Sequence, residues 1–286
     1  MSISGRAKLA GVVGWPVAQS LSPRLHGHWL AAHGVDGAYV PLAVKREDFA
    51  RAIEMLRACG FAGVNVTVPH KEAAFAIAHE ADDAARAAGA ANLLLFDGGR
   101  ITGRNTDAGG LAASLTEALG KNALQGKTAA LLGAGGAARA AILALDALGA
   151  GEIRIVGRNP VRAEHLAREF SHRTKALLRA FGWLSWPGAA HNAGILVNAT
   201  SAGMSGKQAL DLVLDPLPVT AVVADLVYNP LETELLKQAE ARGNRTVDGL
   251  GMLMHQAVPA FEAFYGERPQ VTAALRSELK KALRHG

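Results

Sequence analysis

Hydrophobic and polar positions follow two different periods along the chain. Short apolar or β-branched runs recur throughout the sequence; they occupy residues 10–13, 37–41, 63–68, 91–96, 128–132, 152–156, 194–198 and 221–225. Between most of these runs lie Ala- and Leu-rich segments whose apolar positions repeat at helical spacing, as in 47–58 and 137–148. Alternation of strands with helices of this kind is typical of α/β folds built on parallel sheets.

A break in this pattern follows the strand pair that ends at 103-GRNTD-107. A predicted helix over 108–119 leads into the polar stretch KNALQGK at 121–127, after which a new β-α-β unit begins. A chain of 286 residues accommodates two domains of ordinary size. We therefore expect a domain boundary after the GRNTD segment.

Composition argues against several classes of protein. Half of the residues are hydrophobic and 19% are charged, which favours packed cores over disorder. The single cysteine, Cys59, excludes an internal disulfide framework and a multi-thiolate metal site, and it suits a reducing cytosol. The 30 basic and 25 acidic residues give a net charge of +5, but the cations are spread along the chain rather than gathered with aromatic residues, so no nucleic-acid partner is expected.

Two apolar segments resemble targeting or membrane sequences only in part. The run near the N-terminus is broken by Gly14 and Pro16, and the long apolar tract 128–151 contains Arg139 and Asp146. We therefore predict a strand and a loop in place of a signal peptide, and no membrane span. A cytoplasmic protein that binds small anionic ligands is the expectation that fits both the charge and the cysteine content.

The clearest motif is 128-TAALLGAGGAARAAILALDALG-149, where an apolar strand runs into Gly133-x-Gly135-x-x-Ala138 and a helix follows at once. Gly133 allows the tight turn, Gly135 lets the backbone approach a pyrophosphate, and Ala138 lets helix and strand pack closely. The bare pattern also fits an ordinary glycine-rich α/β turn. With the next strand in place at 152–156, it predicts a dinucleotide site.

The end of that next strand indicates which dinucleotide is bound. An NAD site carries an acidic residue there for the ribose 2′-hydroxyl, whereas this chain has Arg158, with Arg162 one turn later. A planar guanidinium suits a 2′-phosphate, so we predict NADP. The alternative is that both arginines are solvated surface residues.

The segment 19-QSLSPRLHGHWL-30 suggests a second anion site. Pro23 fits the first helical position and Ser22 the N-cap, with Ser20 two residues upstream, so two hydroxyls and a helix N-terminus can face one carboxylate. Simple capping by Ser22 is the alternative.

Three histidines at positions 26, 28 and 33 are potential metal ligands, but the first two would point to different sides of the helix and no acidic cluster accompanies them. We expect no metal.

Lys71 is unusual because it follows Pro69 in the first turn of a predicted helix, within 64-VNVTVPHKEAAFAIA-78. A helix N-terminus carries partial positive charge and disfavours an ammonium group. With Pro69 as the first helical residue, Lys71 would be the third and would lie close to free backbone N–H groups. A lysine whose charged form is disfavoured suits acid/base exchange between an alcohol and a ketone; the alternative is a side chain bent away into water.

Several segments, taken together, resemble the shikimate dehydrogenase family, and they occur in the family's order from about Gly11 to Pro269. These segments are S-x-S-P (20–23), NVTVPHK (65–71), GAAN (89–92), GRNTD (103–107), GAGGAA (133–138), NATSAGM (198–204), DLVYNPLET (225–233) and GLGMLMHQ (249–256). The resemblance implies NADPH-dependent reduction of 3-dehydroshikimate to shikimate in aromatic amino-acid biosynthesis. The chain departs from the family pattern at Gly27, where Asn is usual, and at 157-GRNP-160, where Asn-Arg-Thr is common.

The resemblance also implies roles for individual residues. Lys71 would be the acid/base group with Asp107 beside it, although an acid at the start of a helix is also a common N-terminal preference. The substrate-binding residues would be Ser20 and Ser22 for the carboxylate, Asn65, Thr67, Asn92, Asp107 and Gln256 for the ring hydroxyls, and Tyr228 to close the carboxylate side. The cofactor-binding residues would be Gly133, Ala134, Gly135, Gly136, Ala137, Arg158 and Arg162, with Leu226 and Gly249 near the nicotinamide.

The implied fold has two α/β domains with the active site in the cleft between them. Residues 1–107, completed by 249–286, would form the substrate domain, and residues 108–248 a doubly wound, Rossmann-type NADP domain. Two alternatives remain: a quinate/shikimate dehydrogenase that prefers NAD, against which Arg158 speaks, and a non-catalytic NADP-binding sensor, against which the pair Lys71 and Asp107 speaks. The expected partner is a small-molecule substrate, and the chain would be a monomer or a homodimer.

Overall fold

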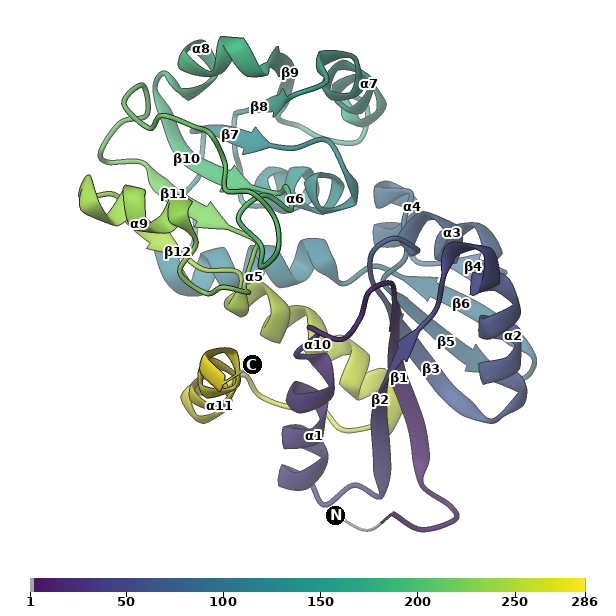
Figure 1. The fold of residues 1–286 in the computed structure, drawn as a ribbon. Helices are drawn as coiled ribbons and strands as arrows, with labels where there is room; N and C mark the ends of the chain where they lie inside the picture. The colour runs from purple at the N-terminus through teal and green to yellow at the C-terminus, as the bar shows by residue number, and fades with distance from the viewer. Residues whose placement is uncertain (1–2, 286) are drawn as a thin grey trace. The chain divides into compact units, whose positions relative to one another are not determined.

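The computed structural model describes residues 3–285 and divides the chain into two compact units. The first comprises Met1–Thr106 and Leu253–Gly286, and the second Asp107–Met252. The expected substrate domain ended at Asp107 and resumed at Gly249. Each unit contains its own six-stranded sheet (Figure 1).

The first unit is built on a six-stranded sheet with the order β2-β1-β3-β5-β6-β4. Its strands are β1 Lys8–Gly14, β2 Gly37–Ala43, β3 Phe61–Val66, β4 Glu80–Ala81, β5 Leu93–Asp97 and β6 Arg100–Arg104. Its helices are α1 Ser22–Ala32, α2 Phe49–Ala58 with the short η1 Arg46–Asp48 before it, α3 Lys71–Ile77, α4 Asp83–Ala88, most of α10 Leu250–Tyr265, and α11 Ala273–His285.

The expectation of parallel sheets is wrong for part of this unit, because β5 runs antiparallel to both β3 and β6. Gly98 and Gly99 connect β5 to β6 with positive φ angles of 52° and 83°. Two such residues form the tight hairpin turn that suits antiparallel strands. The sheet is therefore mixed, with parallel pairing of β1 to β2 and to β3.

Helices cover both faces of the first sheet. On one face, Phe49 and Ile53 of α2 and Ala74 of α3 pack against Val64 and Leu94. On the other, α1 and α10 form an aromatic cluster with Tyr39 of β2; the helices contribute His26, Trp29, Phe261 and Phe264. This aromatic cluster holds together the two separate chain segments of the unit.

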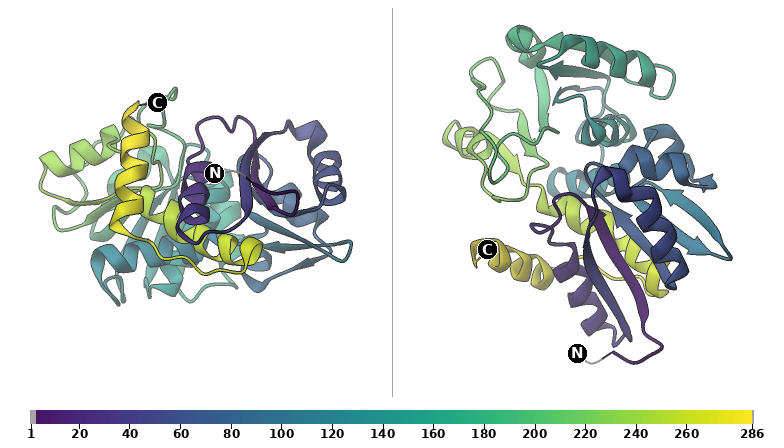
Figure 2. Two further views of the ribbon diagram at one scale, coloured as in Figure 1. Left: turned by 90° about the horizontal axis from the view of Figure 1, so that it is seen from below. Right: turned by 45° about the vertical axis from the view of Figure 1, so that its right-hand side comes forward.

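The C-terminal helix α11 also packs on α1, as both views in Figure 2 show. The His28 ring lies 2.6 Å from a Glu278 carboxylate oxygen, and the Trp29 indole N–H donates to the Gln270 carbonyl at 3.2 Å. These contacts join residues separated by 250 and 241 positions in the sequence.

The second unit contains a six-stranded sheet with the order β12-β11-β10-β7-β8-β9, parallel throughout. Its strands are β7 Thr128–Leu132, β8 Glu152–Gly157, β9 Leu177–Gly182, β10 Ala193–Asn198, β11 Val222–Asp225 and β12 Arg245–Val247. Its helices are α5 Asp107–Leu119, α6 Gly136–Ala147, α7 Pro160–Phe170, α8 Trp186–Ala190 after the short η2 Trp183–Ser185, and α9 Glu234–Ala241. Counted within the unit, this is the doubly wound order 3-2-1-4-5-6 read from the other edge.

Alternate residues of these strands face two separate cores. Leu131 and Ile155 belong to the core under α5, α6 and α7, whereas Leu132 and Val156 belong to the core under α8 and α9. A strand buried on both faces reads as a continuous apolar run. The apolar runs of β7 and β10 fit this rule, and these two strands lie at the centre of the sheet.

The strands that the sequence analysis missed are at sheet edges. β4, β9 and β12 each end a sheet, and β4 and β12 contain two and three residues. Short strands are common at sheet edges, where they limit pairing with other chains. β4 and β12 are therefore too short to show a hydrophobic pattern, whereas β9 has six residues and is largely apolar.

Candidate active site

Lys71 is the first residue of α3, and not the third as expected. The His70 N–H donates to the Thr67 carbonyl at 3.0 Å, and the Ala74 N–H to the His70 carbonyl at 2.8 Å. Pro69 therefore lies within a turn over Thr67–His70, and the helix begins after it. The Lys71 carbonyl accepts the Ala91 N–H at 2.9 Å, which ties the helix start to the GAAN segment.

Ser22 is also placed differently from the prediction. The Leu25 N–H donates to the Leu21 carbonyl at 3.0 Å, so Leu21 is the N-cap of α1 and Ser22 is its first residue. The Ser22 side chain does not cap the helix. Instead, its backbone N–H donates to Ser20 Oγ at 3.3 Å, so the two serines of the S-x-S-P segment lie next to each other at the helix start.

The structure connects three of the expected ring-hydroxyl ligands by hydrogen bonds within the first unit. Asn65 Nδ2 donates to the Asn92 carbonyl at 3.2 Å, and Asn92 Nδ2 donates to Gln256 Oε1 at 3.3 Å. Asn65 and Asn92 are buried and Gln256 is half-buried. These hydrogen bonds bring together residues from three segments that are far apart in the sequence.

Thr106 is part of this chain of amides, and the sequence analysis did not assign it a role. Its N–H donates to Asn92 Oδ1 at 2.8 Å, and its hydroxyl accepts from Asn92 Nδ2 at 2.9 Å. Thr106 belongs to the GRNTD segment and directly precedes the expected acid. That position in a recognised motif could have suggested a role for Thr106. That acid, Asp107, is the buried first residue of α5 and belongs to the second unit.

The second unit has a pocket of about 900 Å³ at the carboxyl end of its sheet. Segments that follow three strands line it: 133–135 after β7, 157–159 after β8 and 199–202 after β10. β7 and β10 are the neighbours at which the strand order reverses. Ligands of doubly wound folds bind at this switch point.

The glycine-rich turn of this pocket has the geometry that a dinucleotide requires. Gly133 has a φ of +108°, and a Cβ there would lie 3.0 Å from Thr200 Cγ2. A Cβ at Gly135 or Gly136 would meet no atom within 4 Å, so the start of α6 is open to a ligand. Free N–H groups at an open helix N-terminus bind phosphate.

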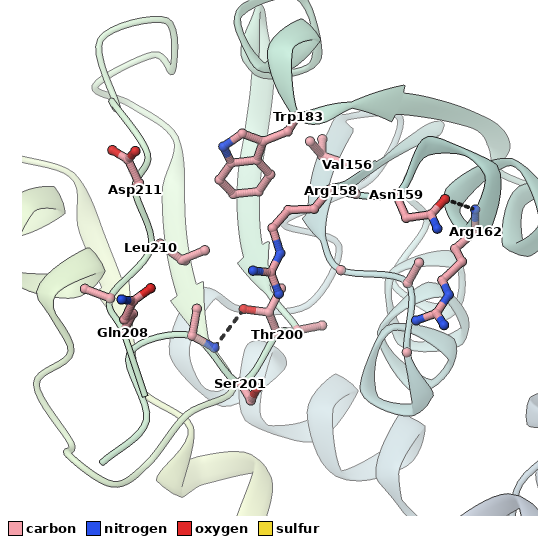
Figure 3. A pocket seen from close by; sticks show the side chains of 17 residues that line it. Val156, Arg158, Asn159, Arg162, Trp183, Thr200, Ser201, Gln208, Leu210 and Asp211 are labelled. Carbon is pink, nitrogen blue, oxygen red and sulfur yellow. Dashed lines mark hydrogen bonds between the residues drawn. The ribbon is translucent and has the colours of Figure 1, made fainter. Parts of the chain in front are cut away.

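Arg158 and Arg162 line the same pocket (Figure 3). Arg158 follows β8 directly and extends across the pocket toward Thr200, below the ring of Trp183. Arg162 lies on the other side of Asn159, whose side chain accepts the Arg162 N–H at 3.2 Å and so caps α7. No acidic residue stands at the tip of β8, so the described residues there offer donors to a phosphate and no carboxylate to a ribose hydroxyl.

Arg139, on α6, does not contribute to the lining of this pocket. Its guanidinium makes two hydrogen bonds to the Glu169 carboxylate at 2.6 and 2.7 Å. These bonds lower the pKa of the Glu169 carboxyl, and the opposing effect of burial, which raises it, is smaller.

The pocket also has lining residues that the sequence analysis missed, namely Trp183, Thr200, Ser201 and the segment 208–211. Thr200 and Ser201 belong to the NATSAGM segment, whose position after β10 could have identified them.

A buried network fixes the loops after β10 and β11. The Asp225 carboxylate accepts hydrogen bonds from Asn198 Nδ2 at 2.9 Å, Thr233 Oγ1 at 2.7 Å and the Val227 N–H at 3.0 Å. Burial raises the pKa of Asp225 to about 6 despite these donors. Leu226 and the half-buried Tyr228, two of the expected ligands, lie in the loop that this network holds.

Gly249 packs against the same loop. A Cβ at this position would lie 2.5 Å from the Leu226 carbonyl oxygen and 2.8 Å from that of Val227. Only a glycine allows the backbones to approach this closely. The two residues expected near the nicotinamide are therefore neighbours in the second unit.

The three histidines of the first helix have separate environments. His26 stacks on Tyr39 with ring centroids 3.8 Å apart, His28 pairs with Glu278, and His33 contacts Phe261. Within residues 3–285, no group of three or more His, Cys, Asp or Glu side chains could hold a metal ion. None of the helices described is long and apolar enough to cross a membrane.

Comparisons with known families cover most of the chain. The family model described as "Shikimate dehydrogenase substrate binding domain" matches residues 12–94, and the model described as "Shikimate / quinate 5-dehydrogenase" matches residues 114–205.

Individual relatives are similar over nearly the full length. The chain is 49% identical to the shikimate dehydrogenase (NADP(+)) of Paramagnetospirillum magneticum, over 96% of this chain and 99% of the relative. Shikimate 5-dehydrogenase from Thermus thermophilus, solved with NADP(H) and shikimate, superposes with a TM-score of 0.84 at 37% identity, over 97% and 98% of the two chains. Quinate dehydrogenase from Corynebacterium glutamicum, solved with NAD, has a TM-score of 0.87 at 30% identity, over 96% and 99%.

Proposed function

The chain belongs to the shikimate dehydrogenase family, and we propose that it catalyses the NADPH-dependent, reversible reduction of 3-dehydroshikimate to shikimate. It is an oxidoreductase that acts on a CH–OH group and takes part in aromatic amino-acid biosynthesis. The observation that supports this function best is the pocket at the switch point of the second unit. Its open helix start and its two arginines suit NADP, the cofactor named for the relative that is 49% identical.

The cofactor would be held by backbone and guanidinium groups of the second unit. The N–H groups at the start of α6 would bind the pyrophosphate, and Arg158 the 2′-phosphate, with Arg162 as a second cation. Leu226 and Gly249 would support the nicotinamide end. When bound, NADPH supplies the hydride that reduces the ring carbonyl.

The substrate would be held by the first unit. Ser20 and Ser22 would bind the carboxylate, and Tyr228 is a further residue proposed for that end of the substrate. Asn65, Thr67, Asn92 and Gln256 would bind the ring hydroxyls. The hydrogen-bonded amides described above hold three of these side chains in fixed orientations, which is what positions a ring for reaction.

Lys71 would transfer the proton. As the carbonyl carbon receives the hydride, the Lys71 ammonium donates a proton to the carbonyl oxygen and becomes an amine; in the reverse direction the amine removes the hydroxyl proton. Asp107 would accept a hydrogen bond from the same hydroxyl. The position of Lys71 at the first residue of α3, tied through its carbonyl to the Ala91 N–H of the GAAN segment, supports this role.

The test is the reduction of NADP by the purified protein with shikimate as the electron donor, monitored through the absorbance of NADPH. We expect steady turnover that depends on both compounds. Binding of NADP without turnover would instead identify a non-catalytic sensor. A monomeric or homodimeric state and a cytoplasmic location remain predictions.

A further inference from the structure

Tyr39 lies beside the substrate-binding residues, although no sequence motif includes it. It stands in β2 and is buried, with 7% of its surface exposed. Its hydroxyl donates to Asn65 Oδ1 at 2.8 Å. The phenol thus contacts a residue proposed to bind a ring hydroxyl of the substrate.

The contact with Tyr39 determines which atoms Asn65 offers to a ligand. A side-chain amide has one oxygen acceptor and two N–H donors. The oxygen accepts from Tyr39, and one N–H is directed to the Asn92 carbonyl at 3.2 Å. The second N–H remains for an oxygen of the substrate, and a flipped amide would lose both bonds.

His26 holds the Tyr39 ring. The two rings are stacked, with centroids 3.8 Å apart and planes 6° from parallel. His26 has 1% of its surface exposed, and neither of its ring nitrogens has a hydrogen-bond partner in the part of the chain described. Burial lowers the pKa of His26 to about 3, so the ring is neutral and acts here as an apolar surface.

We infer that Tyr39 is a positioning residue for the substrate: its hydroxyl holds the Asn65 amide in one orientation, and the stacked, buried His26 ring holds Tyr39. This inference rests on the proposed function. It adds a buried layer behind the residues proposed to bind the ring hydroxyls.

Tyr39→Phe tests the inference, and Tyr265→Phe is its matched control. Tyr265 belongs to the same aromatic cluster, and its hydroxyl donates to the Ala38 carbonyl at 3.0 Å, away from Asn65. Each variant removes one phenol oxygen and keeps the ring. The measurements are the KM for shikimate, the KM for NADP and the melting temperature of both variants and the wild type.

For Tyr39→Phe we expect the KM for shikimate to rise roughly tenfold, the effect of one lost hydrogen bond, with the KM for NADP unchanged. Tyr265→Phe should leave both KM values unchanged. Adding Tyr39→Phe to Asn65→Ala should raise the KM no further, because the hydroxyl acts through Asn65. A wild-type KM for shikimate in Tyr39→Phe, or equal changes in both tyrosine variants, would overturn the inference.

If Tyr39→Phe does not yield folded protein, His26→Leu serves in its place. It keeps the hydroxyl and removes the stacked ring, and it should raise the KM for shikimate by about threefold; an unchanged KM would again overturn the inference. Failure of the wild-type protein to oxidise shikimate would overturn the proposed function itself. Failure of the inference about Tyr39 would appear only in the comparison of the variants with an active wild type.

Discussion

The side-chain amide of Asn198 donates to the Asp225 carboxylate at 2.9 Å, between the ends of β10 and β11. Both side chains are buried, at 0% and 1% exposure. Through its oxygen, Asn198 also accepts the Thr200 N–H at 3.0 Å and the Thr200 hydroxyl at 2.8 Å. A buried carboxylate thus connects the floor of the cofactor pocket to the loop that carries Leu226 and Tyr228.

Replacing this carboxylate should change how stability depends on pH. The pKa of Asp225 is about 6 in the folded protein against an ordinary value of 3.8, because burial disfavours the charged form. The folded state therefore binds the proton more tightly, and the stability from this group is present below about pH 4 and lost as pH rises through 6. At about 1.4 kcal/mol per pKa unit, the loss is roughly 3 kcal/mol.

We expect Asp225→Asn to remove this loss, because an amide retains acceptor and donor groups without the charge. The measurement is the free energy of unfolding in urea at about pH 5 and pH 8 for both proteins. Relative to the wild type, the free energy of unfolding of the variant should be higher at pH 8 than at pH 5. An identical pH dependence in the two proteins would show that Asp225 does not titrate in this range.

His26 should have the opposite effect. Its pKa falls from 6.5 to about 3 on burial, so only the unfolded state binds a proton between these values. Stability from His26 is therefore complete above pH 6.5 and falls by about 1.4 kcal/mol per unit as the pH decreases toward 3. His26→Leu should flatten the acid side of the stability curve. A variant that loses stability in acid as steeply as the wild type would contradict the assignment.

Gly249→Ala should weaken the nicotinamide end of the cofactor site. The added Cβ would lie 2.5 Å from the Leu226 carbonyl oxygen, so the loop must move. We expect a stability loss of about 1–3 kcal/mol from overpacking and a higher KM for NADP. Gly188→Ala is the control: it lies in α8 with no atom within 4 Å of the new Cβ, and it should leave the KM unchanged and stabilise the helix by up to ~1 kcal/mol.

Lys71→Ala should reduce kcat by around 10²–10⁴, the usual contribution of an acid/base group. Shikimate and NADP should still bind, because the serines, the amides and the cofactor pocket are intact. The measurements are steady-state kinetics and equilibrium binding of both ligands. Turnover close to that of the wild type would remove Lys71 from the chemistry.

Arg158→Asp should invert the cofactor preference. It removes a charged donor to the 2′-phosphate, worth roughly 1.5–3 kcal/mol or about 10- to 150-fold in affinity, and it offers an acceptor to the ribose hydroxyl of NAD. Arg162→Ala should have a smaller effect, since Arg162 lies on the other side of Asn159. The readout is kcat/KM with each cofactor. An NADP-to-NAD ratio that Arg158→Asp leaves unchanged would exclude Arg158 from phosphate binding.

Local pattern was enough to predict the parts of the fold with strong periodicity. The strand at 128–132 and the glycine turn after it are adjacent in sequence, and Arg158 directly follows the next strand of the same β-α-β unit, so their geometry follows from the rules of that unit. The predicted first residues of α1 and α3 differ from the observed ones by one and two residues. The start of α1 is set by the hydrogen bond from the Leu25 N–H to the Leu21 carbonyl, and that of α3 by the turn over Thr67–His70.

Tyr39 and Trp183 could not be assigned from sequence. Tyr39 reads as an ordinary core residue of a strand, and its role depends on Asn65, which the fold brings to 2.8 Å from 26 residues away. Trp183 follows the edge strand β9, which the sequence analysis did not predict, so no element placed it at the carboxyl end of the sheet. Long-range contacts of this kind leave no periodic signal.

The most direct test of the function is kcat/KM of the wild-type protein with shikimate and quinate, each with NADP and with NAD. The account predicts the highest value for shikimate with NADP, at least about tenfold above shikimate with NAD, since Arg158 contributes a charged hydrogen bond to the 2′-phosphate. Equal or better use of NAD, or a preference for quinate, would contradict it and favour a quinate/shikimate dehydrogenase of the same family.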